Sequence, residues 1–280
     1  MLLTGVLFVG VTGIVRHLGS NLPAVEAAFI RYAFGVVLMA PFLFRTLRAN
    51  PIPHRLGLFV LRGAVHAAGV MLWFFAMARI PIAEVTAIGF TSPLFITIGA
   101  ALFLGETVRA RRVTAIGIGF VGTLIILRPG IDTIELGALA QLAAAPLFAA
   151  SFLIAKKLTA TESGTTIVAW LSVVVTLALL LPALAVWRTP NTEEVLWLAA
   201  TALCATAGHY TMTKAISLAE VSLLQPFTFL QLVWASALGL IVFDEVPDIW
   251  TIAGGAIIVG SATYIAHREA RLAKQRPAPS

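Results

Sequence analysis

Polar side chains recur at helical spacing inside the long apolar runs of this 280-residue chain. In the run 57–78, Arg62, His66 and Trp73 are separated by four and then seven residues, which places them on one face of a helix. A buried polar group costs free energy unless it has a partner, so the functional interpretation is a polar and aromatic strip of side chains that faces a cavity. A second interpretation stays open, in which Arg62 anchors at the end of its run and His66 bonds to a neighbouring helix.

A second strip of this kind lies in the run 195–213, where His209 stands 136 residues after Trp73 and is followed by Tyr210. We expect both side chains to face the same cavity. A histidine titrates near neutral pH, so His209 in a cavity would permit coupling to protons. The alternative is a histidine that only packs against its neighbours.

Pro93 and Pro226 interrupt the runs 82–104 and 221–243. A proline removes one backbone hydrogen bond and disturbs the turn before it, which leaves carbonyl groups open to a ligand. Broken helices of this type can bind ligands near the middle of a membrane. The nearby side chains that suit a polar or amphipathic ligand are Thr91, Ser92, Gln225, Gln231 and Trp234. The alternative is a kink that serves packing alone.

Arg31 is a further charged residue inside an apolar run, the run 24–44. It lies about 10 Å from the start of that run, at a rise of 1.5 Å per residue. A guanidinium group in this position suits a carboxylate or phosphate on a substrate. The alternative is a structural partner, such as Glu84, which is expected at the same end of the molecule.

The composition indicates that lipid surrounds these runs. The chain is 59% hydrophobic and 11% charged, whereas a soluble domain carries about 25% charged residues. The net charge of +6 is spread over short clusters between apolar runs, which is typical of membrane topology signals and does not suggest nucleic acid. One cysteine and five scattered histidines offer no metal site, cofactor site or catalytic cluster.

Ten apolar segments are predicted to span the membrane, and about 20 residues suffice for each. They are 2–18, 24–44, 57–78, 82–104, 113–127, 136–155, 167–187, 195–213, 221–243 and 249–266. One set of alternate loops, with the C-terminal tail, holds Arg45, Arg48, Arg55, Arg109, Arg111, Arg112, Lys156, Lys157, Lys214, Arg268, Arg271, Lys274 and Arg276. The other set holds Arg16, Arg79, Arg128 and Arg188. Because cytoplasmic loops carry the excess of Lys and Arg, both termini are predicted to be cytoplasmic.

An internal repeat divides the chain. Residues 80–88 align with 216–224, and Glu106 aligns with Glu245. Three arginines follow Glu106, whereas aspartates flank Glu245, so we expect the two glutamates on opposite sides of the membrane. The predicted fold is an all-α polytopic membrane protein of ten transmembrane helices, built as two inverted five-helix repeats. The repeats are 1–130 and 131–267, followed by a basic and disordered cytoplasmic tail at 268–280.

Short motifs in both halves resemble the EamA family of the drug/metabolite transporter superfamily. They are Leu61-Arg62-Gly63, Trp73-Phe74-Phe75-Ala76, Phe90-Thr91-Ser92-Pro93, Leu104-Gly105-Glu106, Gln225-Pro226-Phe227 and Phe243-Asp244-Glu245. The family is similar to YddG-type amino-acid exporters and to S-adenosylmethionine carriers. The resemblance implies ten helices, a central cavity between the halves and alternating access.

We therefore expect a secondary transporter in the bacterial inner membrane, as a monomer or homodimer. Its substrate is expected to be a small polar or amphipathic metabolite, with amino-acid export as the first interpretation and protons as one possible coupling ion. An S-adenosylmethionine or other nucleoside-like carrier is the alternative. A membrane-embedded enzyme and a non-transporting scaffold are alternatives of other classes, and an enzyme would need a catalytic cluster that the sequence does not show.

Overall fold

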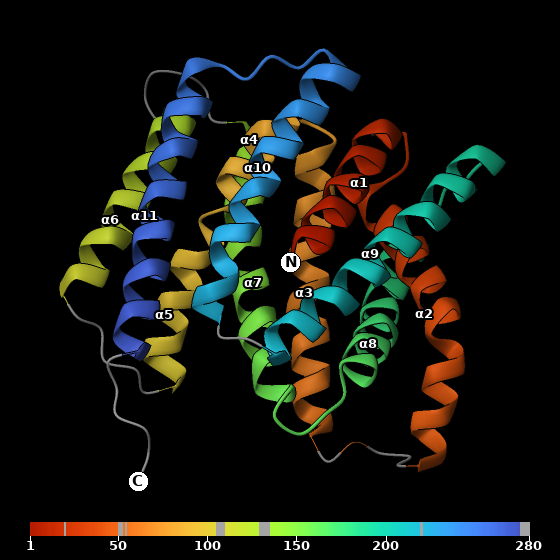
Figure 1. The fold of residues 1–280 in the computed structure, drawn as a ribbon. Coiled ribbons are helices and arrows are strands. Elements are labelled where there is room, and N and C mark those ends of the chain that lie inside the picture. Colours follow the sequence, from red (N-terminus) through yellow and green to blue (C-terminus); the bar gives the residue numbers. More distant parts are fainter. Residues whose placement is uncertain are drawn as a thin grey trace, which may run out of the picture.

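All regular elements that the structure describes are α-helices (Figure 1). The computed structural model describes residues 1–19, 21–49, 53, 55–104, 110–128, 135–218 and 221–274. The helices are α1 (Leu2–Leu18), α2 (Ala24–Ala49), α3 (Leu56–Met77), α4 (Ile82–Gly89), α5 (Ser92–Leu104), α6 (Ala110–Leu127), α7 (Leu136–Leu158), α8 (Gly164–Ala185), α9 (Thr192–Leu218), α10 (Val221–Phe243) and α11 (Ile249–Lys274).

The predicted segment 82–104 is divided into α4 and α5, which is why eleven helices are described for ten predicted segments. The break falls at Phe90 and Thr91, just before Pro93, whose ring lacks the N–H that would bond to the Gly89 carbonyl. In the second half, α10 is one continuous helix across position 226, so the predicted interruption there does not divide it.

The C-terminal segment differs from its prediction. Helix α11 continues to Lys274, so the first part of the predicted disordered tail is helical. Residues 267–274 are mainly Arg, Ala, Leu, Glu and Lys, which are strong helix formers. Residues 275–280 of that predicted tail lie outside the described residues.

Among the described residues, four helices are long and apolar enough to cross a bilayer. They are α2 over Ala24–Arg45, α3, α7 and α8. Several shorter apolar helices accompany them, including α1. This arrangement is that of a polytopic membrane protein.

Most helix contacts join the first half of the chain to the second. Helix α1 contacts α9 and α10, α2 contacts α8 and α9, and α3 contacts α7 and α8. Helices α6 and α11 lie side by side at one edge of the bundle (Figure 1). Helices of the two halves therefore pack against each other, and a cavity between the halves has side chains of both in its wall.

Two glycines bring α6 and α11 into backbone contact. A Cβ atom placed on Gly254 would lie 2.5 Å from the carbonyl oxygen of Gly122, and one placed on Gly122 would lie 2.7 Å from the carbonyl oxygen of Gly254. No side chain fits between backbones at these separations, so glycine is required at both positions.

We predict that Gly254→Ala destabilises the protein by about 1–3 kcal/mol, because the added methyl group meets backbone that cannot move aside. Gly260→Ala on the same helix is the control, since a Cβ there meets nothing within 4 Å. Thermal unfolding in detergent measures both variants. Equal unfolding temperatures for the two variants would show that α6 and α11 are not in close contact.

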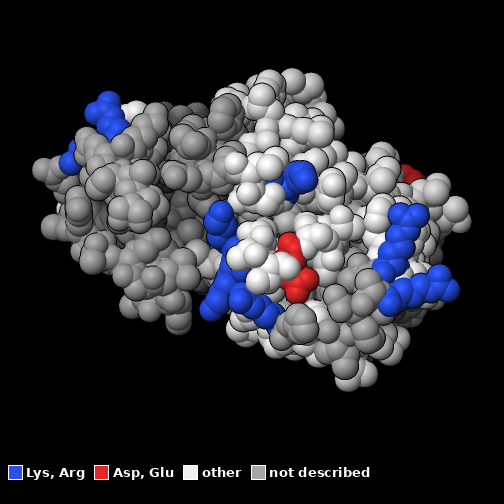
Figure 2. Space-filling model, turned by 60° about the horizontal axis from the view of Figure 1, so that its bottom comes forward, with Lys and Arg blue, Asp and Glu red and all other residues white. Residues whose placement is uncertain are grey.

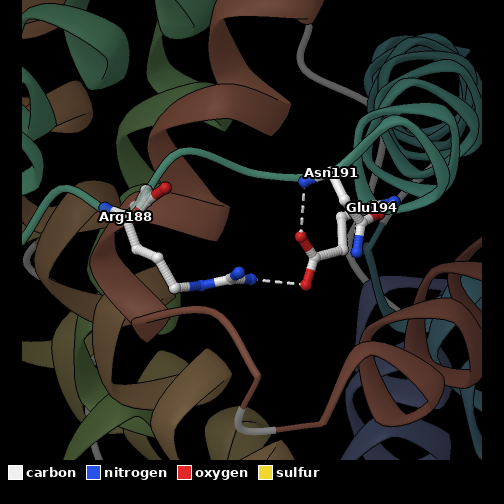
Figure 3. A network of polar contacts seen from close by, with 4 residues as sticks. Arg188, Asn191 and Glu194 are labelled. Carbon is white, nitrogen blue, oxygen red and sulfur yellow. Dashed lines mark hydrogen bonds and ion pairs between the residues drawn. The ribbon is translucent and has the colours of Figure 1, made fainter.

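A network of three residues fixes the start of α9 (Figure 3). The backbone N–H of Glu194 donates to Asn191 Oδ1 at 2.9 Å, and the backbone N–H of Asn191 donates to Glu194 Oε2 at 2.8 Å. This reciprocal pair is a capping box, which satisfies N–H groups that the first helical turn leaves open. Arg188 forms an ion pair with Glu194, and its backbone N–H donates to Glu26 Oε2 at 2.9 Å, which ties this loop to α2.

We predict that this network stabilises the protein at neutral pH and fails in acid. The hydrogen bond from the Asn191 backbone, together with Arg188, lowers the pKa of Glu194 below 4.5, although burial opposes this shift. A group with a lowered folded pKa contributes stability that is complete above its unfolded pKa and is lost as the pH falls through its folded pKa.

Glu194→Gln should accordingly lower the unfolding temperature at pH 7, and its difference from the wild type should shrink below about pH 4. Glu193→Gln is the control, because the Glu193 side chain is exposed and accepts only a long hydrogen bond among the described residues, from Trp197 Nε1 at 3.4 Å. A Glu194→Gln difference that persists unchanged to pH 3 would contradict the prediction.

Candidate substrate-binding cavity

A cavity of about 340 Å³ lies between the two halves of the bundle. Helices α1, α2, α3, α4, α5, α7, α9 and α10 contribute side chains to its wall. Of the residues predicted from the sequence, Arg31, His66, Trp73, Ser92, Pro93, His209 and Gln231 line it. The two predicted strips therefore meet at one cavity, although they are far apart in the sequence.

Three predicted residues do not line this cavity. Thr91 is buried at the end of α4, where its hydroxyl donates to the Ile88 carbonyl at 2.7 Å. Tyr210 is 42% exposed and Trp234 is 50% exposed, on the outer surfaces of their helices. Successive side chains of a helix point about 100° apart, so Tyr210 points away from the cavity when its neighbour His209 points into it. The side chains of Gln225 and Pro226 lie outside the described residues.

A cluster of rings forms the middle of the cavity. The ring centroid of His66 lies 5.3 Å from those of Phe148 and His209, and 6.1 Å from that of Tyr32. Phe8 continues the cluster, at 5.2 Å from His209. All these pairs meet edge to face, which is a favourable arrangement for aromatic rings. The wall therefore presents ring surfaces to a ligand.

The two interpretations of His66 both apply. Its Nδ1 forms a hydrogen bond with Ser151 Oγ on α7 at 3.0 Å, and its ring also faces the cavity. Which of the two atoms donates depends on the tautomer of the histidine. This bond orients the His66 ring, because it fixes one nitrogen and leaves the other side of the ring to the aromatic cluster.

Two arginines place positive charge on the wall. The Arg31 guanidinium lies over the Tyr32 ring, 3.8 Å from its centroid, and no described ion pair joins Arg31 to Glu84. Arg62 is 2% exposed and donates from Nη1 to the Ile167 carbonyl on α8 at 2.9 Å, so it is buried between helices. None of the described lining residues is acidic. The cavity therefore suits a neutral or anionic ligand better than a cation.

Three buried polar atoms on the wall have no hydrogen-bond partner among the described residues: Arg62 Nε, Gln141 Oε1 and His209 Nδ1. Such atoms are costly in hydrocarbon unless a ligand or water completes their bonds. Gln141 was missed from the sequence. Its one signal was a lone glutamine within an alanine-rich apolar run, without the helical spacing that identified His66.

An ion pair lies beyond one end of the cavity. Arg16 on α1 pairs with Glu245, which follows α10, and also donates to the Met77 carbonyl of α3 at 2.9 Å. The second Glu245 oxygen accepts from the backbone N–H of Ile82 at the start of α4, at 2.8 Å. Arg16 and Glu245 thus join four helices just beyond the cavity. The pair of Arg16 and Glu245 is called the lock below.

Charges are distributed unequally between the two ends. Arg128 pairs with Asp248 at 3.2 Å near the lock, so Arg16, Arg128, Glu245 and Asp248 share one end. Glu106, which was predicted to correspond to Glu245 in the repeat, lies outside the described residues. At the opposite end, Figure 2 shows more Lys and Arg than Asp and Glu on the face where α2 ends and α3 begins. There Lys156 donates to the Ile216 carbonyl at 2.9 Å.

Comparison with known proteins places the chain among transporters. The sequence model of the EamA-like transporter family matches residues 1–128 and 135–266. A riboflavin transporter of Vibrio cholerae is 34% identical over 98% of this chain and 94% of its own length. An S-adenosylmethionine uptake transporter of Rickettsia bellii is 30% identical over 91% and 87%. The pseudopaline exporter CntI of Pseudomonas aeruginosa is 27% identical over 88% and 87%.

A solved crystal structure agrees in fold with a TM-score of 0.65, at 19% identity, over 94% of this chain and 98% of the other. That likeness shows the fold alone. These three relatives are named as transporters or exporters, and the family match extends over both halves of the chain. By these matches, the chain belongs to the EamA-like transporter family.

Proposed function

We propose that this protein is a secondary transporter of a planar aromatic heterocycle, with riboflavin as the first substrate to test. The observation that carries the proposal is the cavity wall, which combines ring surfaces with two arginines and has no acidic residue among its described members. Flat rings stack favourably on such surfaces. The similarity to riboflavin transporters supports this choice.

Amino-acid export, the first interpretation of the sequence, fits the wall less well. An amino acid is much smaller than a cavity of about 340 Å³, and its ammonium group would have no described carboxylate to bind. S-adenosylmethionine is the second candidate, because relatives carry that name and its adenine would suit the rings. Its sulfonium and ammonium charges, however, would face Arg31 and Arg62.

The helix contacts support an inverted repeat. Suppose that α1, α2 and α3 of the first half correspond to α7, α8 and α9 of the second. The symmetry then requires a contact of α3 with α7 to match that of α1 with α9, and a contact of α3 with α8 to match that of α2 with α9. All four contacts are present. Helix α1 runs toward the lock, whereas α7 runs away from it toward Lys156 and Ile216. With α4 and α5 counted as one broken span, each half has five spans, and the second is inserted upside down.

Alternating access then requires the lock to open. Cavity residues Val11 and Thr12 precede Arg16 by about one turn, and Val85 and Thr86 follow Ile82 by the same distance. We place the lock at the outer end of an inner-membrane protein with both termini in the cytoplasm, because the basic loops lie at the opposite end. Substrate gradients or protons would drive the exchange.

Riboflavin exchange into liposomes that contain the purified protein tests the substrate. We expect the wild type to accelerate counterflow of riboflavin, followed by its fluorescence. Trp73→Ala should reduce the rate about tenfold, since loss of one stacking surface costs about 1–3 kcal/mol.

The matched control is Trp234→Ala, because that ring lies outside the cavity and its loss should change the rate by less than about twofold. Exchange of S-adenosylmethionine or amino acids with no exchange of riboflavin would refute the proposed substrate. Equal losses in both tryptophan variants would refute the assignment of the cavity.

A cross-link across the lock tests the moving end. The test uses Arg16→Cys with Glu245→Cys in a Cys204→Ser background. A short bis-methanethiosulfonate reagent, which joins the two thiols through disulfide bonds, should stop exchange, and reduction of these disulfides should restore it. Arg128→Cys with Asp248→Cys is the control, because it joins the ends of α6 and α11, which already pack together. We expect exchange to continue in the control, and undiminished exchange with the lock cross-linked would contradict alternating access at this end.

A further inference from the structure

One amide oxygen of the cavity wall, Gln141 Oε1, has no described hydrogen-bond donor. Gln141 on α7 is 3% exposed, lines the cavity, and has no described hydrogen-bond partner for Oε1. An unpaired buried acceptor costs about 1–3 kcal/mol. Leucine at this position would avoid that cost, so the amide is explained best by a bond that forms with a ligand.

Packing between α3 and α7 determines what Gln141 lies beside. His66 bonds to Ser151 and Gly69 packs against Phe148, while a Cβ on Gly137 would lie 2.9 Å from Ile80, three residues beyond the end of α3. The residue number rises along α3 by as much as it falls along α7 from one contact to the next. The two helices are therefore antiparallel, in a fixed register. In that register Gln141 is level with position 76, about one turn from Trp73 toward the lock. The ring face of Trp73 and the amide of Gln141 therefore serve the same end of the cavity.

The broken span supplies a second acceptor next to this amide. A Cβ placed on Gly89 would lie 2.9 Å from Gln141 Nε2, so the amide rests on the last residue of α4. Pro93 has no N–H, and the Gly89 carbonyl therefore lacks the donor that a continuous helix would provide. Gly89 also lines the cavity. Acceptor groups thus gather at the end of the cavity that is farther from Arg62.

We propose that Gln141 is the residue that recognises the polar edge of the substrate ring. Its Oε1 accepts a hydrogen bond from a ring N–H, and its Nε2 can donate to the carbonyl beside that N–H, as one amide pairs with another. The ligand class is a heterocycle with a lactam or imide edge, and riboflavin has such an edge at N3–H. Trp73 stacks on the ring, while the polar chain of the substrate extends toward Arg31, His66 and Ser151. This inference rests on the proposed function and deepens it.

The experiment compares riboflavin with 3-methylriboflavin, in which a methyl group replaces the imide hydrogen. Binding to the purified protein in lipid nanodiscs is measured by quenching of flavin fluorescence. We expect the wild type to prefer riboflavin by at least about tenfold, because a site built around a hydrogen bond rejects an analogue that lacks the donor. In Gln141→Leu the ratio of the two dissociation constants should fall to near one.

Two further variants separate recognition from general effects. Gly89→Ala should push the amide from its position and lower the same ratio in part, because the new methyl group meets the flexible end of Gln141. Gln231→Leu removes another glutamine of the cavity wall, and the ratio should stay at the wild-type value whatever happens to affinity. Thermal unfolding of empty Gln141→Leu should be unchanged or higher, since an unpaired buried acceptor is removed.

The outcomes are distinct. Riboflavin binding without preference over the methylated ring, or a preference that Gln141→Leu retains, would overturn this inference and leave the proposed function in place. A lower unfolding temperature of empty Gln141→Leu would assign the residue a structural role and would also overturn it. Failure of the wild type to bind either flavin would overturn the proposed function together with the inference.

Discussion

Hydrocarbon offers no hydrogen bonds, and this constraint organises the whole protein. Polar groups inside the bundle must find partners on neighbouring helices, and the structure shows where they do. Arg62 bonds to a carbonyl of α8, and His66 bonds to Ser151 of α7. These bonds cross between the two halves of the chain. They fix the relative positions of the helices that enclose the cavity. Arg62, Gln141 and His209 each bring to its wall one polar atom without a described partner.

The same constraint explains how much the sequence reveals. Long apolar runs predicted the helices well, because a spanning helix needs both length and apolar composition. The break between α4 and α5 falls just before a proline, where the missing N–H already indicated it. Helix ends were less predictable: α11 extends to Lys274, because local helix propensity continues after the apolar run has ended.

Side-chain direction was the weaker part of the prediction. The spacing of Arg62, His66 and Trp73 shows that they share a face, and all three line the cavity. Tyr210 and Trp234 carry no such pattern, and their direction depends on which neighbour each helix packs against. Gln141 stood alone in its run, so spacing could not reveal it. Recognising it required the α3–α7 register, which comes from contacts between residues far apart in the sequence.

The arginines of the cavity have an electrical consequence. A guanidinium group is charged at any physiological pH, so the empty cavity carries positive charge even when its substrate is neutral. Moving one elementary charge across a potential of 100 mV changes the free energy by about 2.3 kcal/mol. Any shift of Arg31 and Arg62 within the field during a switch of access would make that step sensitive to voltage. In such a carrier the membrane potential would act on the charged residues of the cavity itself, also while the empty carrier reorients.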